Sequence, residues 1–126
     1  ILDGAIDKYA SLQNGLAVNV KLLQERPDLV RKLLRAKSKA SRFIEQNERE
    51  TAEMLARIWN SDVAIALESL RATKAAFTAN GIPTDDEIKE HLALDAQILK
   101  LPEPVAAAKV FDFTMQREVN KELGIR

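Results

Sequence analysis

Residues 27–59, PDLVRKLLRAKSKASRFIEQNERETAEMLARIW, decide the fold that this sequence predicts. Pro27 suits the first turn of a helix, where an amide N–H has no partner within the helix. Asn47 can cap a second helix, with Glu50 three residues later in an arrangement like a capping box. Apolar residues recur at helical spacing through both halves, at Leu29, Val30, Leu33, Leu34, Ala36, Ala40, Phe43, Ile44, Ala52, Leu55, Ala56 and Trp59. The stretch therefore predicts two consecutive amphipathic helices that form a hairpin.

The residues before this hairpin give weaker signals. Residues 1–13 carry apolar side chains at approximate helical spacing and predict a short first helix, although Gly4 interrupts it. Residues 16–20, LAVNV, are the one candidate for a strand because the run is short, apolar and partly β-branched. Asn19 can instead cap a short helical turn that ends before Pro27.

Two helices are expected after the hairpin, each with a start signal. Ser61 or Asp62 can cap the first of them, and Gly81 can end it in the left-handed conformation. The segment Thr84-Asp85-Asp86-Glu87 is a capping box that predicts the start of the second, which runs to Leu99. Pro102 and Pro104 then force an extended connection.

The last part of the chain predicts one more helix. Residues 105–110 fit either a short helix or an extended segment, and the sequence does not decide between them. Asp112 can cap a final helix over residues 113–122, with Gly124 as its C-cap. The expected fold is mainly α, with about five to six helices and at most one short strand, in a single domain or fragment that covers residues 1–126.

Composition bounds the function. A chain of 126 residues is one domain's worth, and 19 Lys plus Arg against 19 Asp plus Glu leave no net charge to attract nucleic acid or an anionic membrane. The absence of cysteine excludes thiolate nucleophiles, disulfides and cysteine-bound metals. No apolar run reaches the roughly 20 residues that span a bilayer, so no transmembrane segment is expected. Because the chain begins Ile-Leu-Asp without Met, we expect a fragment or a processed chain.

The candidate chemical residues favour no reaction. Glu87, His91 and Asp95 share one helix face, but one His without Cys or a second His makes a poor metal site, and we interpret the three as a solvated acidic face. Serines without a nucleophile elbow and the absence of glycine-rich phosphate loops exclude the common hydrolase and nucleotide-binding motifs. We expect no catalytic residue, no metal site and no cofactor.

The helix at 27–46 and the residue before it are strongly basic, with seven cations at Arg26, Arg31, Lys32, Arg35, Lys37, Lys39 and Arg42. Nucleic-acid binding is disfavoured because stacking aromatics are lacking, and Glu48, Glu50 and Glu53 in the next helix are the expected neutralising partners. The large aromatic residues are expected to be core, at Trp59, Phe77, Phe111 and Phe113.

The serial order of these segments resembles a known family. The order is NGLAVN at 14–19, LLQERPDLVRKLLRA at 22–36, FIEQNERETAEMLA at 43–56, TANGIPTDDEIKEHL at 78–92 and VFDFTMQREVNKELGI at 110–125. It is similar to the C-terminal part of the solute-binding proteins of ABC importers, in the nitrate/sulfonate/taurine group that includes binders of thiamine precursors. The resemblance spans nearly all of this chain and about the final third of such a protein.

The resemblance implies a two-lobed α/β fold of the type II periplasmic-binding-protein kind, of which this chain would supply helical cladding. It implies a periplasmic or lipid-anchored extracellular protein, not an enzyme, that captures a small polar or anionic solute and delivers it to ABC permease subunits. Asn14 and Asn19 near the hinge are the candidate solute-binding residues, although both also suit a turn and a helix cap. Without the lobes, the isolated piece is expected to self-associate. A stand-alone helical module that docks a protein partner is the alternative, and an enzyme of the thiamine-pyrimidine-synthesis type is disfavoured because only His91 is present.

Overall fold

A computed structural model describes residues 15–74, 78 and 80–125 of the chain. These residues form helices and no strand, so the prediction of a mainly helical fold is confirmed. The elements are α1 (Val20–Glu25), α2 (Pro27–Gln46), α3 (Glu48–Trp59), α4 (Val63–Thr73), α5 (Asp85–Ile98), α6 (Ala107–Val110) and α7 (Thr114–Leu123). The helix expected within residues 1–13 lies outside the described part. The described helices exceed the five to six expected because α1 forms and because part of the undecided segment 105–110 becomes α6.

Asn19 begins α1, and the alternative of a strand over residues 16–20 is not realised. Its side-chain Oδ1 accepts a hydrogen bond from the Lys21 N–H at 2.7 Å, and its carbonyl accepts one from the Leu23 N–H at 3.1 Å. Both bonds turn the chain into a helix before Pro27 begins the next one. The cap therefore decides between the two structures that the sequence left open.

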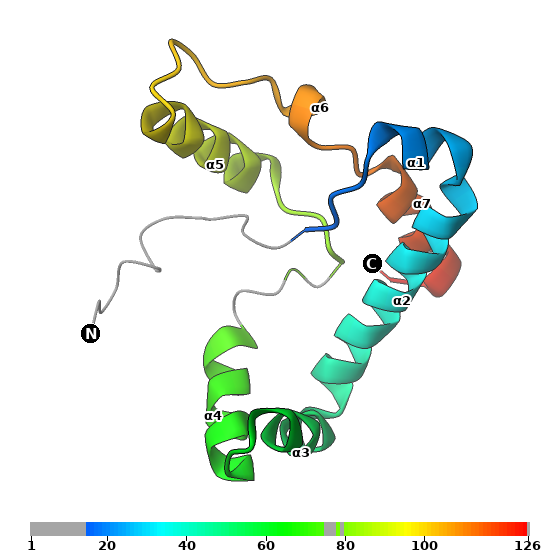
Figure 1. The fold of residues 1–126 in the computed structure, drawn as a ribbon, viewed down its shortest axis with the longest axis vertical. Coiled ribbons are helices and arrows are strands. Elements are labelled where there is room, and N and C mark those ends of the chain that lie inside the picture. Colours follow the sequence, from blue (N-terminus) through cyan, green and yellow to red (C-terminus); the bar gives the residue numbers. More distant parts are fainter. Residues whose placement is uncertain (1–14, 75–77, 79, 126) are drawn as a thin grey trace.

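The two helices predicted over residues 27–59 form as α2 and α3, but the predicted hairpin between them is wrong, because α3 packs mainly on α4 and meets α2 only near their junction (Figure 1). The junction also differs from the prediction. Asn47 makes no side-chain cap for α3; its Nδ2 instead donates to the carbonyl of Phe43 at 3.0 Å. Asn47 thus closes the last turn of α2, where a helix has carbonyls without partners. The predicted capping box between Asn47 and Glu50 is wrong for this reason.

Small side chains hold α3 against α4. Ala52, Ala56 and Ala66 are buried at the contact, and Leu55 and Leu67 pack beside them. Asn60 reverses the chain between the helices in the left-handed conformation, with φ 52°. Asp62 occupies the cap position of α4 without a side-chain bond, and the buried Ser61 hydroxyl has no hydrogen-bond partner among the described residues. Neither predicted cap forms, so packing and not capping fixes where α4 begins.

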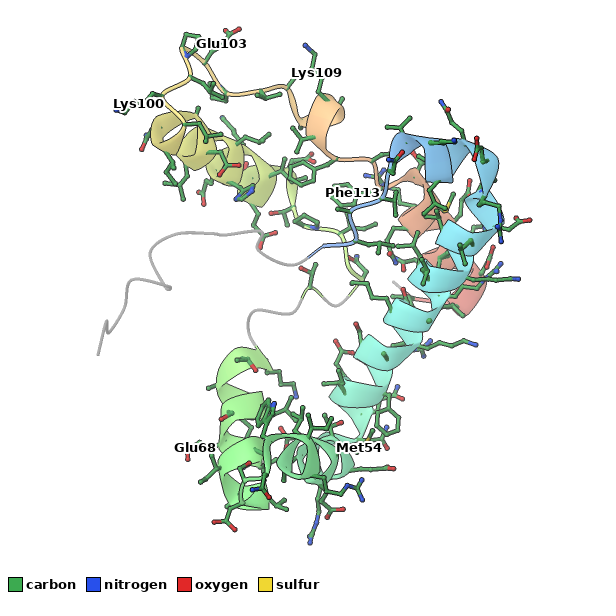
Figure 2. All side chains as sticks on the ribbon, viewed as in Figure 1. Met54, Glu68, Lys100, Glu103, Lys109 and Phe113 are labelled. Atoms are coloured by element: carbon green, nitrogen blue, oxygen red, sulfur yellow. The ribbon has the colours of Figure 1, made fainter. Side chains whose placement is uncertain are left out.

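The helices follow an open path and do not stack into one bundle (Figure 1). Helix α2 is the longest element, and it carries α1 at its N-terminal end, α7 along one side and α3 at its C-terminal end. Among the described helices, α5 packs only against the short α6. In the connection between them, the Lys100 and Glu103 side chains point outward (Figure 2). Much of the surface of these helices is therefore not covered by another described helix.

The capping box at the start of α5 forms as predicted. The Glu87 N–H donates to Thr84 Oγ1 at 3.2 Å, and Glu87 Oε2 accepts from the Thr84 N–H at 2.7 Å and from its hydroxyl at 2.8 Å. These hydrogen bonds to Thr84, first the one from its backbone and then the one from its side chain, lower the pKa of Glu87 below its ordinary value. Gly81 precedes the box in the left-handed conformation with φ 71°, but it does not end α4 as predicted, because α4 already ends at Thr73.

Thr84→Ala is expected to destabilise the first turn of α5 by about 1 kcal/mol, because the turn loses its cap. Since the pKa of Glu87 is lower in the folded state, its contribution is present above about pH 4.5 and lost as the pH falls through the lowered pKa. Amide exchange in α5, measured as a function of pH, checks both effects. Asp86→Asn, in the same turn but outside the box, is the control, and an acid dependence unchanged by Thr84→Ala would contradict the assignment.

Candidate functional site

Two of the cations of α2, Arg31 and Arg35, pair with carboxylates of α7 and not of α3. Arg31 Nη2 lies 2.7 Å from Glu118 Oε2, and Arg35 lies at the same distance from Glu122 Oε2. Because Glu118 and Glu122 are four residues apart, they lie on one face of α7, and Arg31 and Arg35 match that spacing on α2. The prediction that α3 supplies the neutralising acids is therefore wrong for these two arginines.

The acids of α3 have other partners. Glu48 Oε2 accepts from Arg71 of α4 at 2.9 Å, and Glu53 pairs with Arg49 within α3 at 3.2 Å. The hydrogen bond from Arg71 is the main reason that the pKa of Glu48 is lowered. Glu48 thus ties α3 to α4, the helix that packs against it.

A buried polar network lies beside the ion pairs, where α2, α7 and the turn at 80–82 meet. Gln116 Nε2 donates to Ser38 Oγ at 3.0 Å and to Asn120 Oδ1 at 2.8 Å. Asn120 Nδ2 donates to the carbonyl of Asn80 at 2.8 Å. Ser38, Gln116 and Asn120 are all buried, so these bonds are made out of contact with water. The network joins segments that are far apart in the sequence, and no motif predicted it.

The predicted C-cap of α7 forms, whereas the helix starts one residue later than predicted, with Phe113 at the N-cap position and Asp112 just before it. Asp112 Oδ1 accepts from the Thr114 N–H at 2.8 Å, and this bond is the main cause of the lowered pKa of Asp112. Gly124 ends the helix with φ 63°, and the carbonyl of Leu123 accepts from Arg42 of α2 at 2.9 Å. Between these ends Val119 is completely buried. Helix α7 is thus a capped element that is held on α2 by charges, a buried network and an apolar contact.

The acidic face with His91 gives no metal site. Glu87 is engaged in the capping box, and His91 Nε2 lies 3.5 Å from Asp95 Oδ2. The His91 ring also lies beside Phe111, with ring centroids 6.3 Å apart. In the described part of the chain, no group of three His, Cys, Asp or Glu side chains could hold a metal ion.

The aromatic residues are less buried than predicted. Trp59 is 51% exposed at the end of α3, so its prediction as core is wrong in this structure. Phe111 and Phe113 are half-buried and stack on each other, with centroids 5.8 Å apart. Phe77 lies outside the described residues.

Of the two candidate solute-binding residues, the structure describes only Asn19. Asn14 lies outside the described residues. Asn19 uses its Oδ1 as the cap of α1, while its amide makes no hydrogen bond within the described part of the chain. A role in solute binding for either residue stays a prediction.

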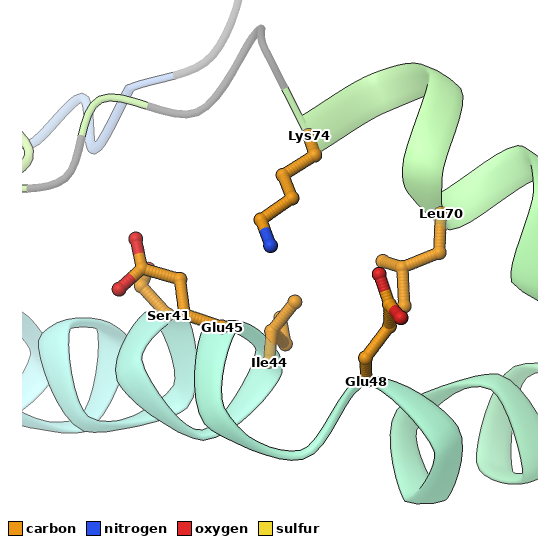
Figure 3. A pocket seen from close by; sticks show the side chains of 6 residues that line it. All are labelled: Ser41, Ile44, Glu45, Glu48, Leu70 and Lys74. Carbon is orange, nitrogen blue, oxygen red and sulfur yellow. The ribbon is translucent and has the colours of Figure 1, made fainter.

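A small cavity lies between α2, the start of α3 and α4 (Figure 3). Ser41, Ile44, Glu45, Glu48, Leu70 and Lys74 line it. Its volume of about 30 Å³ has room for about two water molecules. Pockets for small-molecule ligands are typically about 300–1,000 Å³, so this cavity is too small for a solute.

No protein-family model, curated protein or solved structure matches the chain. Its function is therefore inferred from its own residues. Within the described segments, no helix is both long enough and apolar enough to cross a bilayer. What the described residues offer is a set of helical faces and not a chemical centre.

Proposed function

We propose that this chain is the C-terminal helical part of the solute-binding protein of an ABC importer, in the nitrate/sulfonate/taurine group. The observation that carries the proposal is the serial order of the segments from 14–19 to 110–125, which resembles that family over nearly the whole chain. In this role the chain takes part in the reversible capture of a small polar or anionic solute and performs no catalysis. The protein is periplasmic or lipid-anchored outside the cell, and its partners are the permease subunits.

The uncovered apolar surface of the described helices supports this role. Large apolar side chains are exposed on α3, α4 and the end of α5, at Met54, Ile58, Trp59, Val63, Ile65, Ile98, Leu99 and Leu101. Small soluble domains rarely leave so much apolar surface open to water. Helices that pack on the outside of a larger α/β lobe would bury these apolar faces against the lobe.

The test uses the full-length protein with an alkanesulfonate, nitrate, taurine or a pyrimidine. At a concentration about 100-fold above its Kd, the solute should stabilise the folded protein by about 2.7 kcal/mol. For a protein of this expected size, this corresponds to a rise in Tm of roughly 3–4 °C. No change in Tm with any of the four would contradict the proposal.

Asn19→Asp tests whether Asn19 contacts the solute. Aspartate keeps the oxygen that caps α1 but replaces the amide N–H donors with a second acceptor. If the amide binds an anionic solute, the variant should weaken the Kd by about tenfold or more and leave the Tm of the free protein nearly unchanged. Asn19→Ala is the matched comparison, because it should lower the Tm through loss of the cap. An unchanged Kd in Asn19→Asp would limit Asn19 to capping.

The second candidate is a stand-alone helical module that docks a protein partner. The observation that favours it is the same set of exposed apolar side chains, combined with the basic character of α2. Arg31 and Arg35 are already held by α7, so docking has to use other residues of α2. The complete reading frame separates the candidates, since transport requires a secretory signal and roughly two hundred upstream residues with alternating strands and helices.

A further inference from the structure

Helix α2 has an apolar face that no described helix covers. Leu33, Ala36, Ala40 and Phe43 follow one another at spacings of three, four and three residues, which is the a/d spacing of a helix-pairing seam. All four are exposed, Leu33 at 42% and Phe43 at 37%. On a helix of about 3.6 residues per turn, they project roughly opposite to Arg31, Arg35 and Ser38, which face α7. We call these four residues the open stripe.

The open stripe is bordered by positive charge. Lys32 and Lys39 lie along one edge, and neither makes a salt bridge with any described residue. Lys37 lies at the other edge, with its Nζ directed toward the turn at Gly81. Of the acids of α2, Asp28 lies one turn before Lys32 and 3.7 Å from Arg31, and Glu45 lines the cavity beside α4. A partner for this face therefore needs apolar side chains that contact the open stripe and carboxylates on either side of them that contact the lysines.

The opposite face of α2 shows how such a partner binds. There two glutamates of α7 pair with Arg31 and Arg35, and the buried Gln116 donates to the buried Ser38. Both faces of α2 therefore offer cations to a helix that carries carboxylates, and the open stripe adds an apolar centre where the other face has the polar Ser38. One is occupied by an amphipathic helix with carboxylates, and the other is open.

We propose that the open stripe binds an acidic amphipathic helix of a partner protein, with leucine-like side chains over Ala36 and Ala40 and carboxylates on Lys32 and Lys39. The small residues at the centre let two helix axes approach closely, while Leu33 and Phe43 supply apolar area at either end. A second copy of α2 is a poor occupant because it would place lysines against lysines. The proposal names a partner chemistry for α2 and stands whether or not the chain serves in transport.

The experiment measures binding of a synthetic helical peptide to the 126-residue chain. The probe has about four heptads, with Ile and Leu at positions a and d and Glu at every e and g. A matched peptide carries Lys at every e and g. Fluorescence anisotropy should give a Kd on the order of 10 µM for the acidic peptide and at least about tenfold weaker binding for the basic one.

Two sets of variants locate the binding face. Lys32→Glu combined with Lys39→Glu should weaken the acidic peptide about tenfold or more, and Ala36→Asp should do the same. Lys89→Glu combined with Lys109→Glu, an equal charge change at exposed positions elsewhere, should leave the Kd unchanged. All substituted positions are exposed, so circular dichroism of the variants should match that of the parent chain.

Three results would overturn the proposal. The first is equal binding, or no binding, of the acidic and basic peptides. The second is a Kd that depends on Arg31→Gln plus Arg35→Gln and not on the lysines, because the peptide would then displace α7. The third is a dimer in sedimentation equilibrium that Ala36→Asp dissociates, which would assign the face to a second copy of the chain.

Discussion

Replacing Val119 with aspartate is expected to detach α7 from α2. Val119 is 0% exposed, and the nearby cations Arg31 and Arg35 already pair with Glu118 and Glu122. A carboxylate placed there would lose its water without gaining a free partner, which costs about 3 kcal/mol or more. Amide exchange of residues 114–123 should therefore rise by more than about 100-fold, since about 1.4 kcal/mol corresponds to a factor of ten.

Arg117→Asp is the control for the Val119 variant. It changes charge two residues earlier on the exposed side of α7 and should cost under about 1 kcal/mol. Because α3 and α4 contact each other and not α7, their exchange rates should change little in either variant. Equal protection of α7 in both variants would show that Val119 does not hold the helix.

The parts of the fold that the sequence predicted depend on bonds between near neighbours. Each of the signals for these parts involves residues within about four positions of one another. They are Pro27 in the first turn of α2, the Thr84 capping box, the Asp112 hydrogen bond to Thr114 and the Gly124 C-cap. Such signals need no knowledge of which helices meet. They located these helix ends and predicted a mainly helical chain, although the equally local cap signals at Asn47, Ser61 and Asp62 did not form caps.

The errors concern residues whose partner depends on the tertiary arrangement. Asn47 could serve the end of α2 or the start of α3, and the backbone at the bend selects the first. Trp59 lies on an apolar stripe, but no described helix covers that end of α3. Periodicity identifies the apolar face of a helix and does not say what covers it.

The contact between α2 and α7 was missed because its partners are 78 to 87 residues apart. A signal was present, since Gln116 and Asn120 share one face of α7 with Val119 between them, and Glu118 and Glu122 repeat the spacing of Arg31 and Arg35. That pattern shows that α7 is amphipathic. It does not choose α2 over α3 or α4 as the element it binds.

We expect the buried network of Ser38, Gln116 and Asn120 to select α2 as the helix that α7 binds. Gln116→Glu tests this role, because glutamate has almost the same shape as glutamine. The Gln116 amide donates to Ser38 Oγ and Asn120 Oδ1, and a glutamate carboxylate can donate to neither. Asn120 Oδ1 then faces another acceptor in a buried site, at a cost of about 1–3 kcal/mol in the free energy of unfolding. Urea denaturation at neutral pH, followed by circular dichroism, measures the loss.

The pH dependence of the free energy of unfolding of Gln116→Glu distinguishes the loss of hydrogen bonds from a simple packing defect. Burial beside an acceptor should raise the pKa of the introduced carboxyl in the folded state above its unfolded value. The destabilisation should therefore be present at neutral pH and decrease as the pH falls through that raised pKa, where the protonated group again donates a hydrogen bond. Gln97→Glu, at an exposed position on α5, should cost about 0.5 kcal/mol or less and should not show this recovery in acid. A Gln116→Glu variant as stable as the parent at neutral pH would mean that the network does not determine where α7 binds, and that the arginine pairs and Val119 suffice.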